Sequence, residues 1–458
     1  MKYHLIGIGG AGMSVVAELL MARGAVVSGS DAKASAATAH LVDLGATVHV
    51  GHDATHVPED AVVVVSSAIR ETNPELAIAR ERGQQVIHRS QALALAAEGR
   101  DFVAVAGAHG KTSTSAMLAV ALRALGADPS WAIGGTISGI GVGAHMGNGS
   151  ALVAEADESD ASFLNYTPRL AIVTNVEPDH LDHYGTREAF EDAFVQFSRL
   201  IVPGGLLIVC ADDDGAARLG SKALSEGVRV VSYGRGEALA GAEHHVRIGN
   251  ESHVAGCARG TLDDGSGSYP VTLNVVGGHN LLNAAAAWAA GVELGQEPAA
   301  MAEALGSFVG TGRRFETTGT AYGVTVVDDY AHHPTEVRAL LTAARPLAGE
   351  GRLVVCFQPH LFSRTRDFAA DFGAALAAAD EVVVLDVYPA REDPIPGVTG
   401  ELVAQAARAA GAAAVTYVAD KQRAPEVLAA LLRPGDLALT VGAGDVTAVG
   451  PAAVGAAR

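Results

Sequence analysis

The chain of 458 residues is long enough to bury several hydrophobic cores, and its length predicts about three domains. Its net charge of -19 and the lack of any basic run exclude a nucleic-acid partner, because nothing would neutralise a phosphate backbone. No apolar run reaches the roughly 18 residues of a membrane span, and the three widely separated cysteines indicate neither a disulfide framework nor a zinc cluster. We therefore expect a cytoplasmic protein that binds no membrane.

Short apolar strands alternate with alanine-rich helical stretches along the first 98 residues, which is typical of a parallel, doubly wound sheet. A polar break at 98–101 separates this region from a central α/β region, which includes a Gly-, Ser- and Thr-rich β insert at 246–276. Strands return after the glycines at 310 and 312. The pattern predicts three α/β lobes in series: a Rossmann-like lobe (1–98), a central P-loop lobe (99–312) and a second Rossmann-like lobe (313–458).

The segment FVAVAGAHGKTSTS at 102–115 predicts a buried strand, a glycine loop and a helix. Gly107 and Gly110 let the backbone N–H groups turn toward an anion, and the new helix favours a phosphate at its start. Lys111 adds a positive charge, and the Thr112 hydroxyl is a suitable ligand for magnesium. We interpret this segment as a nucleoside triphosphate site.

A second glycine loop, GIGGAGMS at 7–14, follows the first expected strand, and Asp31 closes the second strand. By itself this is a dinucleotide fingerprint, with Gly7, Gly9 and Gly12 at the turn. The residues leave three alternatives open: NAD(P), another ligand that contains a diphosphate, or a structural turn. Two diphosphate loops in one chain indicate two phosphorylated substrates.

Acids gather after two strands of the central lobe. The segment VAEADESD at 153–160 is either a solvated acidic turn or a magnesium site in which Glu155 acts with Thr112. The segment TNVEPDHLDHYG at 174–185 alternates acids and imidazoles, including His180, which is more typical of a metal or phosphoryl site than of a core. In GGHNLLNAAAA at 277–287, Asn280 either caps a helix or contacts an adenine edge.

The last lobe carries polar loops after its expected strands, where open α/β sheets bind ligands. They include DDYAHHPTE at 328–336, FQPHLFSRTRDF at 357–368 and DVYPAREDPIPG at 386–397. His332, His360 and Arg364 have the chemistry to receive a carboxylate and an amine, although each charge alone is also consistent with surface solvation.

Taken in order along the whole chain, these motifs resemble those of the Mur ligase family of peptidoglycan synthesis. The resemblance implies an ATP-dependent ligase that joins L-alanine to the lactyl carboxylate of UDP-N-acetylmuramate through an acyl phosphate. The expected substrates are ATP, UDP-N-acetylmuramate and L-alanine, with two Mg²⁺ ions as cofactors and a monomer or homodimer as the assembly.

Residue by residue, the resemblance implies catalytic roles for Lys111, His180 and Arg364. It implies magnesium ligands at Thr112, Glu155 and His180. The implied ATP site comprises Gly107, Ala108, His109, Gly110, Lys111, Thr112, Ser113, Asn280, Arg314 and Asp329. The implied UDP-sugar site comprises Gly7, Gly9, Gly10, Gly12, Asp31 and Ser67, and the implied amino-acid site comprises Tyr330, His332, His360 and Arg364.

Departures from the family pattern bear on which member this is. Ala108 and Ser113 stand where threonines are commoner, and neither change removes a backbone donor. No lysine occurs between Lys111 and Lys222, whereas several sister ligases use a carbamylated lysine there. This favours the alanine-adding member. The alternatives are a ligase that attaches a preformed tripeptide to the same UDP-sugar and an NAD(P)-binding dehydrogenase.

Overall fold

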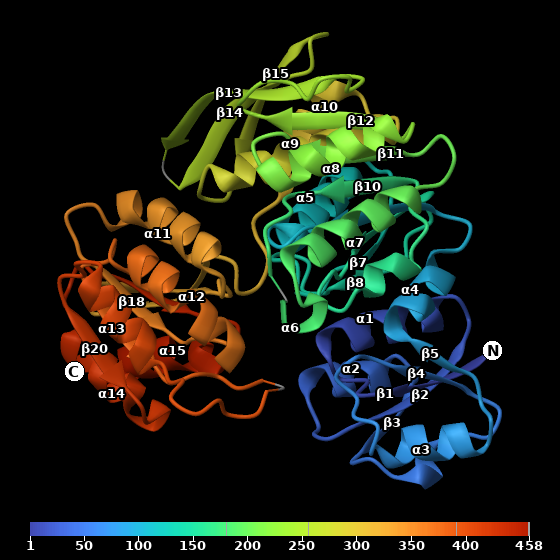
Figure 1. The fold of residues 1–458 in the computed structure, drawn as a ribbon, viewed down its shortest axis with the longest axis horizontal. Helices are drawn as coiled ribbons and strands as arrows, with labels where there is room; N and C mark the ends of the chain where they lie inside the picture. The colour runs from blue at the N-terminus through green and yellow to red at the C-terminus, as the bar shows by residue number, and fades with distance from the viewer. Residues whose placement is uncertain (180, 255, 391, 457–458) are drawn as a thin grey trace. The chain divides into compact units, whose positions relative to one another are not determined.

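The computed structural model describes residues 1–179, 181–254, 256–390 and 392–456. The chain divides into two compact units (Figure 1). The first comprises Met1–Ser252, Arg259–Leu273 and Leu281–Val309, and the second comprises His253–Ala258, Asn274–Asn280 and Gly310–Arg458. His180, which we predicted as a metal ligand, lies outside the described residues.

The first unit begins with a parallel sheet of order β3-β2-β1-β4-β5. Its strands are β1 (Lys2–Ile6), β2 (Val26–Asp31), β3 (Thr47–Val50), β4 (Val62–Val65) and β5 (Val86–His88). Its helices are α1 (Ala11–Ala22), α2 (Ala36–Asp43), η1 (Ala54–His56), α3 (Pro74–Glu81) and α4 (Arg89–Ala97). Helices α1 and α4 lie on one side of the sheet and α3 on the other (Figure 1). The glycine loop at 7–10 therefore leaves the carboxyl end of the central strand, β1.

The second sheet has the order β15-β14-β13-β12-β11-β10-β6-β9-β7-β8. Its strands are β6 (Asp101–Ala106), β7 (Ser130–Ala132), β8 (Ala144–His145), β9 (Ala151–Glu155), β10 (Leu170–Val173), β11 (Leu206–Cys210), β12 (Arg229–Gly234), β13 (His245–Val254), β14 (Cys257–Asp263) and β15 (Ser268–Leu273). Its helices are α5 (Lys111–Ala124), η2 (Ser162–Asn165), α6 (Leu181–Tyr184), α7 (Arg187–Arg199), α8 (Asp214–Ser225), α9 (His279–Glu293), α10 (Pro298–Ala304) and η3 (Leu305–Ser307).

Strand order places the second glycine loop at a topological switch point. The chain leaves β6 toward β7 through α5, and it leaves β10 toward β11 in the opposite direction through α7. Because such crossovers are right-handed, α5 and α7 cover opposite faces of the sheet. Ligands bind at the carboxyl ends of strands at such a point, which is where the loop after β6 lies. The expected β insert is confirmed as β13, β14 and β15.

The second unit contains a sheet of order β16-β17-β21-β18-β19-β20. Its strands are β16 (Glu316–Ala321), β17 (Val324–Asp329), β18 (Leu353–Phe357), β19 (Glu381–Leu385), β20 (Val415–Val418) and β21 (Leu437–Val441). Its helices are α11 (Pro334–Ala348), α12 (Phe362–Leu376), α13 (Glu401–Ala409), η4 (Lys421–Arg423), α14 (Ala424–Leu431), η5 (Asp445–Ala448) and α15 (Val449–Ala456). One core packs α11, α12 and α13 on the sheet, and another packs α14 and α15.

The three-lobe α/β prediction is confirmed, because each lobe contains its own sheet with helices. The exact domain boundaries stay predictions. Cys210 and Cys356 are buried as free thiols. Among the described residues, no helix combines the length and the apolar character that a bilayer crossing demands.

A buried carboxylate stabilises the first sheet. The side chain of Glu75 is fully buried in α3, and Ser30 at the end of β2 donates a hydrogen bond to it. Imidazoles of His52 and His56 lie 3.4 and 3.2 Å from the carboxylate, and that of His4 lies 3.7 Å away. Burial alone would raise the pKa of Glu75, but His4 and Ser30 outweigh it and lower the pKa to about 2.

We expect Glu75→Gln to lower the free energy of unfolding by about 2–4 kcal/mol at pH 7, because the imidazoles lose their buried anion. The carboxylate has a depressed pKa in the folded state, so its stabilisation is present above pH 4.5 and is lost as the pH falls toward 2. Urea unfolding across this range should show the two proteins converging at low pH. The exposed Glu59→Gln is the matched control, and equal loss in both variants would contradict the assignment.

Candidate functional site

The central glycine loop turns sharply between β6 and α5. Gly107 and Gly110 have φ values of 127° and 84°, in the region that favours glycine. A Cβ atom at Gly107 would lie 2.2 Å from the Thr174 hydroxyl, and one at Gly110 would lie 2.7 Å from Oδ1 of Asn283. Both positions therefore favour glycine by conformation, and Gly107 does so by space as well, because backbone atoms of Asn175 lie 3.0 Å from its Cβ position. Ala108 and His109 lie between them, and Ser113 lies in the first turn of α5.

Lys111 is the first residue of α5, and its ammonium group is held at the loop. Nζ donates to the carbonyl of Gly107 at 2.6 Å and to the carboxylate of Glu158 at 2.7 Å. Burial would lower the pKa of Lys111, but Glu158 and Asp157 outweigh burial and raise it. The ammonium group therefore stays charged where the helix dipole also favours an anion.

The contact between Lys111 and Glu158 was not anticipated from the sequence. Glu158 is 1% exposed, and its burial raises the pKa to about 7 even though Lys111 acts to lower it. The neighbouring Asp157 has a pKa well below its usual range, because Arg89 and Lys111 outweigh its burial. A carboxylate three residues after Glu155 in an acid-rich segment was the only available signal.

Two predicted magnesium ligands lie together beside the loop. The Thr112 hydroxyl donates to Oε2 of Glu155 at 3.1 Å, and the Gly134 N–H donates to Oε1 at 2.8 Å. Hydroxyl and carboxylate oxygens are the hard ligands that magnesium prefers. The structure therefore brings Thr112 and Glu155 together as expected from the sequence.

Asp31, the acid predicted to belong to the first glycine loop, contacts that loop. Oδ2 of Asp31, at the end of β2, accepts a hydrogen bond from the Gly9 N–H at 2.9 Å. Gly7 has a φ of 77°, and Gly10 caps α1 without a side-chain hydrogen bond. Gly12 lies against Arg89, because a Cβ there would lie 2.1 Å from Nη1 of Arg89 and would displace this guanidinium.

Arg89 was missed by the sequence reasoning. It opens α4 directly after β5, so its position at a strand's carboxyl end was the signal that could have found it. Its Nη2 lies 3.0 Å from Oδ2 of Asp157 in the central lobe. Ser67, predicted from the resemblance, donates to Asp160 at 2.7 Å. These contacts link the two lobes of the first unit.

In the second unit, the four residues that were predicted to bind the amino-acid substrate form one cluster. The ring centroids of Tyr330 and His332 are 5.3 Å apart, and those of His332 and His360 are 5.9 Å apart. Nη1 of Arg364 lies 3.4 Å from Nδ1 of His360, and Arg364 is only 5% exposed. Tyr388, which the sequence reasoning missed, stacks on His360 at 5.8 Å. The cluster combines a buried guanidinium with aromatic walls.

Three other residues of the second unit were predicted to bind the nucleotide: Asp329, Arg314 and Asn280. Asp329 ends β17 and accepts hydrogen bonds from the N–H groups of Phe315 and Ala331, while burial raises its pKa to about 6. Arg314 lies 5.3 Å from the Tyr330 ring centroid. Asn280 lies inside α9, which begins at His279, so it is not the N-cap; its side chain donates to the Val276 carbonyl at 2.7 Å.

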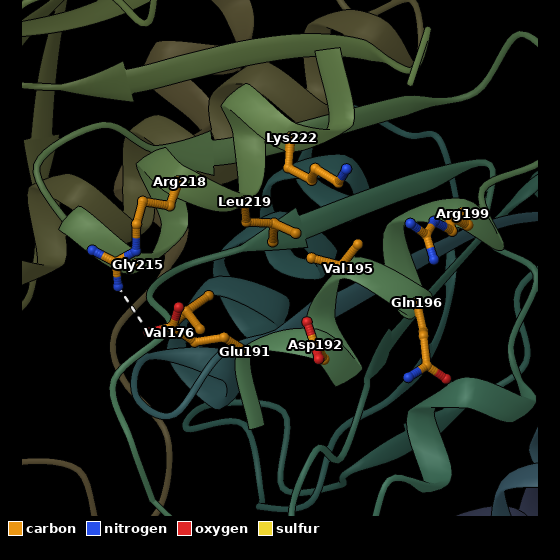
Figure 2. A pocket seen from close by; sticks show the side chains of 10 residues that line it. All are labelled: Val176, Glu191, Asp192, Val195, Gln196, Arg199, Gly215, Arg218, Leu219 and Lys222. Atoms are coloured by element: carbon orange, nitrogen blue, oxygen red, sulfur yellow. Dashed lines mark hydrogen bonds and ion pairs between the residues drawn. The ribbon is translucent and has the colours of Figure 1, made fainter. Parts of the chain in front are cut away.

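A surface groove of about 480 Å³ lies between α7 and α8 (Figure 2). Its apolar floor includes Val195 and Leu219. Arg218 at its rim is paired with Glu191 at 2.8 Å. None of the predicted site residues lines it, so the groove is separate from both glycine loops.

Comparison with known families accounts for nearly the whole chain. The Mur ligase family catalytic domain matches residues 2–101, the Mur ligase middle domain matches 105–291, and the Mur ligase glutamate ligase domain matches 313–444. The chain therefore belongs to the Mur ligase family, which confirms the membership expected from the motifs.

Individual relatives are similar over nearly their full length. The UDP-N-acetylmuramate–L-alanine ligase of Kineococcus radiotolerans is 57% identical over 453 residues, covering 98% of this chain and 95% of the relative. That of Renibacterium salmoninarum is 54% identical over 451 residues, with the same coverage. The crystal structure of UDP-N-acetylmuramate-alanine ligase from Thermotoga maritima matches with a TM-score of 0.81 and 30% identity, over 99% of this chain and 98% of that one.

Proposed function

We propose that this protein is the ATP-dependent ligase that joins L-alanine to the lactyl carboxylate of UDP-N-acetylmuramate, releasing ADP and phosphate. The observation that carries the proposal is the sequence identity of 50–57%, over nearly the full chain, to relatives with the name UDP-N-acetylmuramate–L-alanine ligase. It favours this reaction over the tripeptide-adding ligase and the dehydrogenase.

The chemistry requires an activated acid. A carboxylate is a poor electrophile, so one carboxylate oxygen first attacks the γ-phosphorus of ATP and ADP leaves. The product is an acyl phosphate. The amine of L-alanine then attacks the acyl carbon, the amide bond forms, the amine proton is lost, and phosphate leaves with the oxygen that bridged carbon and phosphorus.

At the central loop we assign residues Gly107 to Ser113 to the ATP phosphates. Backbone N–H groups and the charged Lys111 supply positive potential there, which an anionic protein must provide locally. Burial raises the pKa of Glu158 to about 7 with Lys111 beside it, and release of Lys111 removes an interaction that lowers this pKa, so the released carboxyl takes up a proton rather than repelling the phosphates. Asn280, Arg314 and Asp329 complete the ATP assignment by family resemblance.

The oxygens of Thr112 and Glu155 fit a Mg²⁺ ion, and His180 is the family-based assignment for a second one. When bound, magnesium neutralises charge on the transferred phosphoryl group. The chain itself orients these oxygens: the Gly134 N–H fixes Oε1 of Glu155 and leaves Oε2 directed at Thr112.

The first loop is assigned to the UDP-sugar through Gly7, Gly9, Gly10, Gly12, Asp31 and Ser67. The cluster of Tyr330, His332, His360 and Arg364 is assigned to L-alanine, with the planar guanidinium gripping the carboxylate by two bonds. The cytoplasmic location and the monomeric or homodimeric assembly stay predictions.

Purified protein incubated with Mg²⁺, ATP, UDP-N-acetylmuramate and L-alanine should release ADP and phosphate in equal amounts. A coupled assay that compares L-alanine, glycine, serine and the cell-wall tripeptide measures the selectivity. A clear preference for the tripeptide would contradict the proposal. Tight NAD(P)H binding without ATP consumption would favour the dehydrogenase instead.

Lys111→Ala should abolish turnover, a loss of at least roughly 1000-fold, because the γ-phosphoryl group loses its fixed cation. Binding of UDP-N-acetylmuramate, measured by calorimetry, should change less than about twofold, because that site lies in another lobe. Lys222→Ala, at an exposed lysine paired with Glu226, is the control. Unchanged turnover in Lys111→Ala would remove this residue from the mechanism.

Arg364→Lys should raise the KM for L-alanine roughly tenfold, because a point charge replaces a two-bond fork. The KM for ATP should stay within about twofold, since the altered contact involves only the amino acid. Arg366→Lys on the same helix is the matched control, because its side chain is exposed and paired with Asp367. A change confined to the KM for ATP would show that the amino-acid pocket is misassigned.

A further inference from the structure

The backbone of His109, in the middle of the central glycine loop, is held at both of its polar groups by a single side chain. The His109 N–H donates to Oδ1 of Asn175 at 3.0 Å, and Nδ2 of Asn175 donates to the His109 carbonyl at 3.0 Å. This is the pairing that a neighbouring strand would make, supplied by one amide. An amide is suited to it because it carries a donor and an acceptor in one plane.

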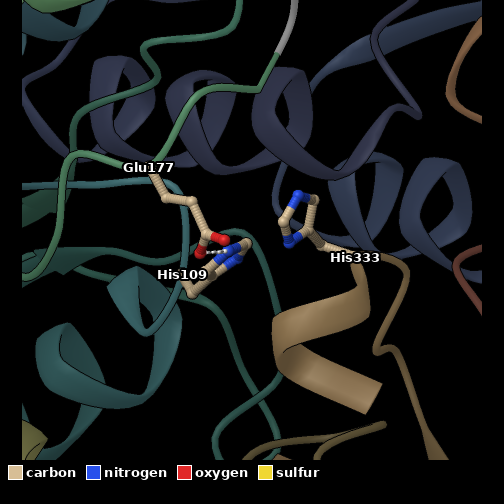
Figure 3. A group of neighbouring side chains, drawn as sticks. All are labelled: His109, Glu177 and His333. Atoms are coloured by element: carbon tan, nitrogen blue, oxygen red, sulfur yellow. Dashed lines mark hydrogen bonds and ion pairs between the residues drawn. The ribbon is translucent and has the colours of Figure 1, made fainter. Parts of the chain in front are cut away.

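Thr174 and Glu177, which lie near Asn175 in the sequence, also contact His109. The Thr174 hydroxyl lies 2.5 Å from the His109 carbonyl oxygen. Oε2 of Glu177 lies 3.0 Å from Nε2 of the His109 ring, and Figure 3 shows the carboxylate turned toward that ring. The segment that follows β10 therefore braces His109 at its N–H group, its carbonyl and its ring.

These contacts hold the part of the loop that has the most backbone freedom. Gly107 and Gly110 flank His109 and Ala108, and glycine loses more backbone freedom on ordering than any other residue. Without contacts from outside the loop, this entropy would be lost when a phosphate binds, and the affinity would be lower. The Thr174 N–H donates to the Ala106 carbonyl at 3.1 Å, so the brace is itself anchored to the strand that leads into the loop.

We propose that Asn175 is a positioning residue for the nucleotide: its amide holds the backbone of His109 so that the loop and Lys111 are ordered before ATP binds. This inference rests on the proposed function, because it takes ATP as the ligand of the loop. Asn175 acts through His109, and it is neutral, so it holds the loop without adding negative charge beside the phosphates.

The test measures ATP binding by calorimetry, separately from turnover, in the full chain with Mg²⁺. Asn175→Ala removes both hydrogen bonds and should raise the Kd for ATP at least roughly tenfold. Asn175→Asp keeps one acceptor but sets a carboxylate oxygen against the His109 carbonyl, so it should raise the Kd further. Asn148→Ala, whose exposed side chain bonds Asp128 in the same lobe, is the matched control and should bind ATP as the native chain does.

The KM values separate positioning from general stability. The KM for ATP should rise in both Asn175 variants, while the KM values for UDP-N-acetylmuramate and L-alanine stay within about twofold. Unchanged ATP affinity in Asn175→Ala, or an equal rise in all three KM values, would overturn the proposal. If Asn175→Ala does not fold, the ATP affinity of Asn175→Asp decides in the same way.

The two proposals fail differently. A native chain that binds ATP but makes no alanine product refutes the proposed reaction, while the calorimetric comparison still judges Asn175. A native chain that does not bind ATP overturns both.

Discussion

An ammonium group held between a loop carbonyl and a buried carboxylate sets the charge of the central site. Lys111 is one of five lysines in a chain with a net charge of -19, and the Gly107 carbonyl and Glu158 fix its position at the start of α5. An acidic protein that binds anionic nucleotides needs such local positive potential. Burial raises the pKa of Glu158 even beside Lys111, so this carboxyl would be easily neutralised without the ammonium group.

Topology explains why the two loops stand where they do. The first follows β1, which lies between β2 and β4, and the second follows β6, which lies between β10 and β9. In both sheets the loop leaves the carboxyl end of a parallel strand at a point where helices diverge to opposite faces. In the third sheet, the loops after β17 and β18 carry His332 and His360, and Arg364 lies in the first turn of α12, which follows the second of these loops. The same architectural rule therefore places all three groups.

The local part of this organisation could be predicted from the sequence. The strand, glycine loop and helix at 102–115 are contiguous, so their spacing alone indicates a phosphate site. The hydrogen-bond partners of Lys111 and His109 could not be predicted, because Glu158 and Asn175 come from distant segments, and the same holds for Arg89, which lies beside Gly12. Which carboxylate of 155–160 meets Lys111 depends on how β9 lies beside β6, and sequence spacing does not determine that register.

The central claim is that the sugar-borne acid attacks the terminal phosphorus of ATP before the amine acts. The most direct test uses UDP-N-acetylmuramate labelled with ¹⁸O in its lactyl carboxylate, together with ATP, Mg²⁺ and L-alanine. Mass spectrometry of the released phosphate should find one ¹⁸O atom per molecule, because the bridging oxygen leaves with phosphorus. Phosphate that carries no ¹⁸O while the amide product forms would contradict the account.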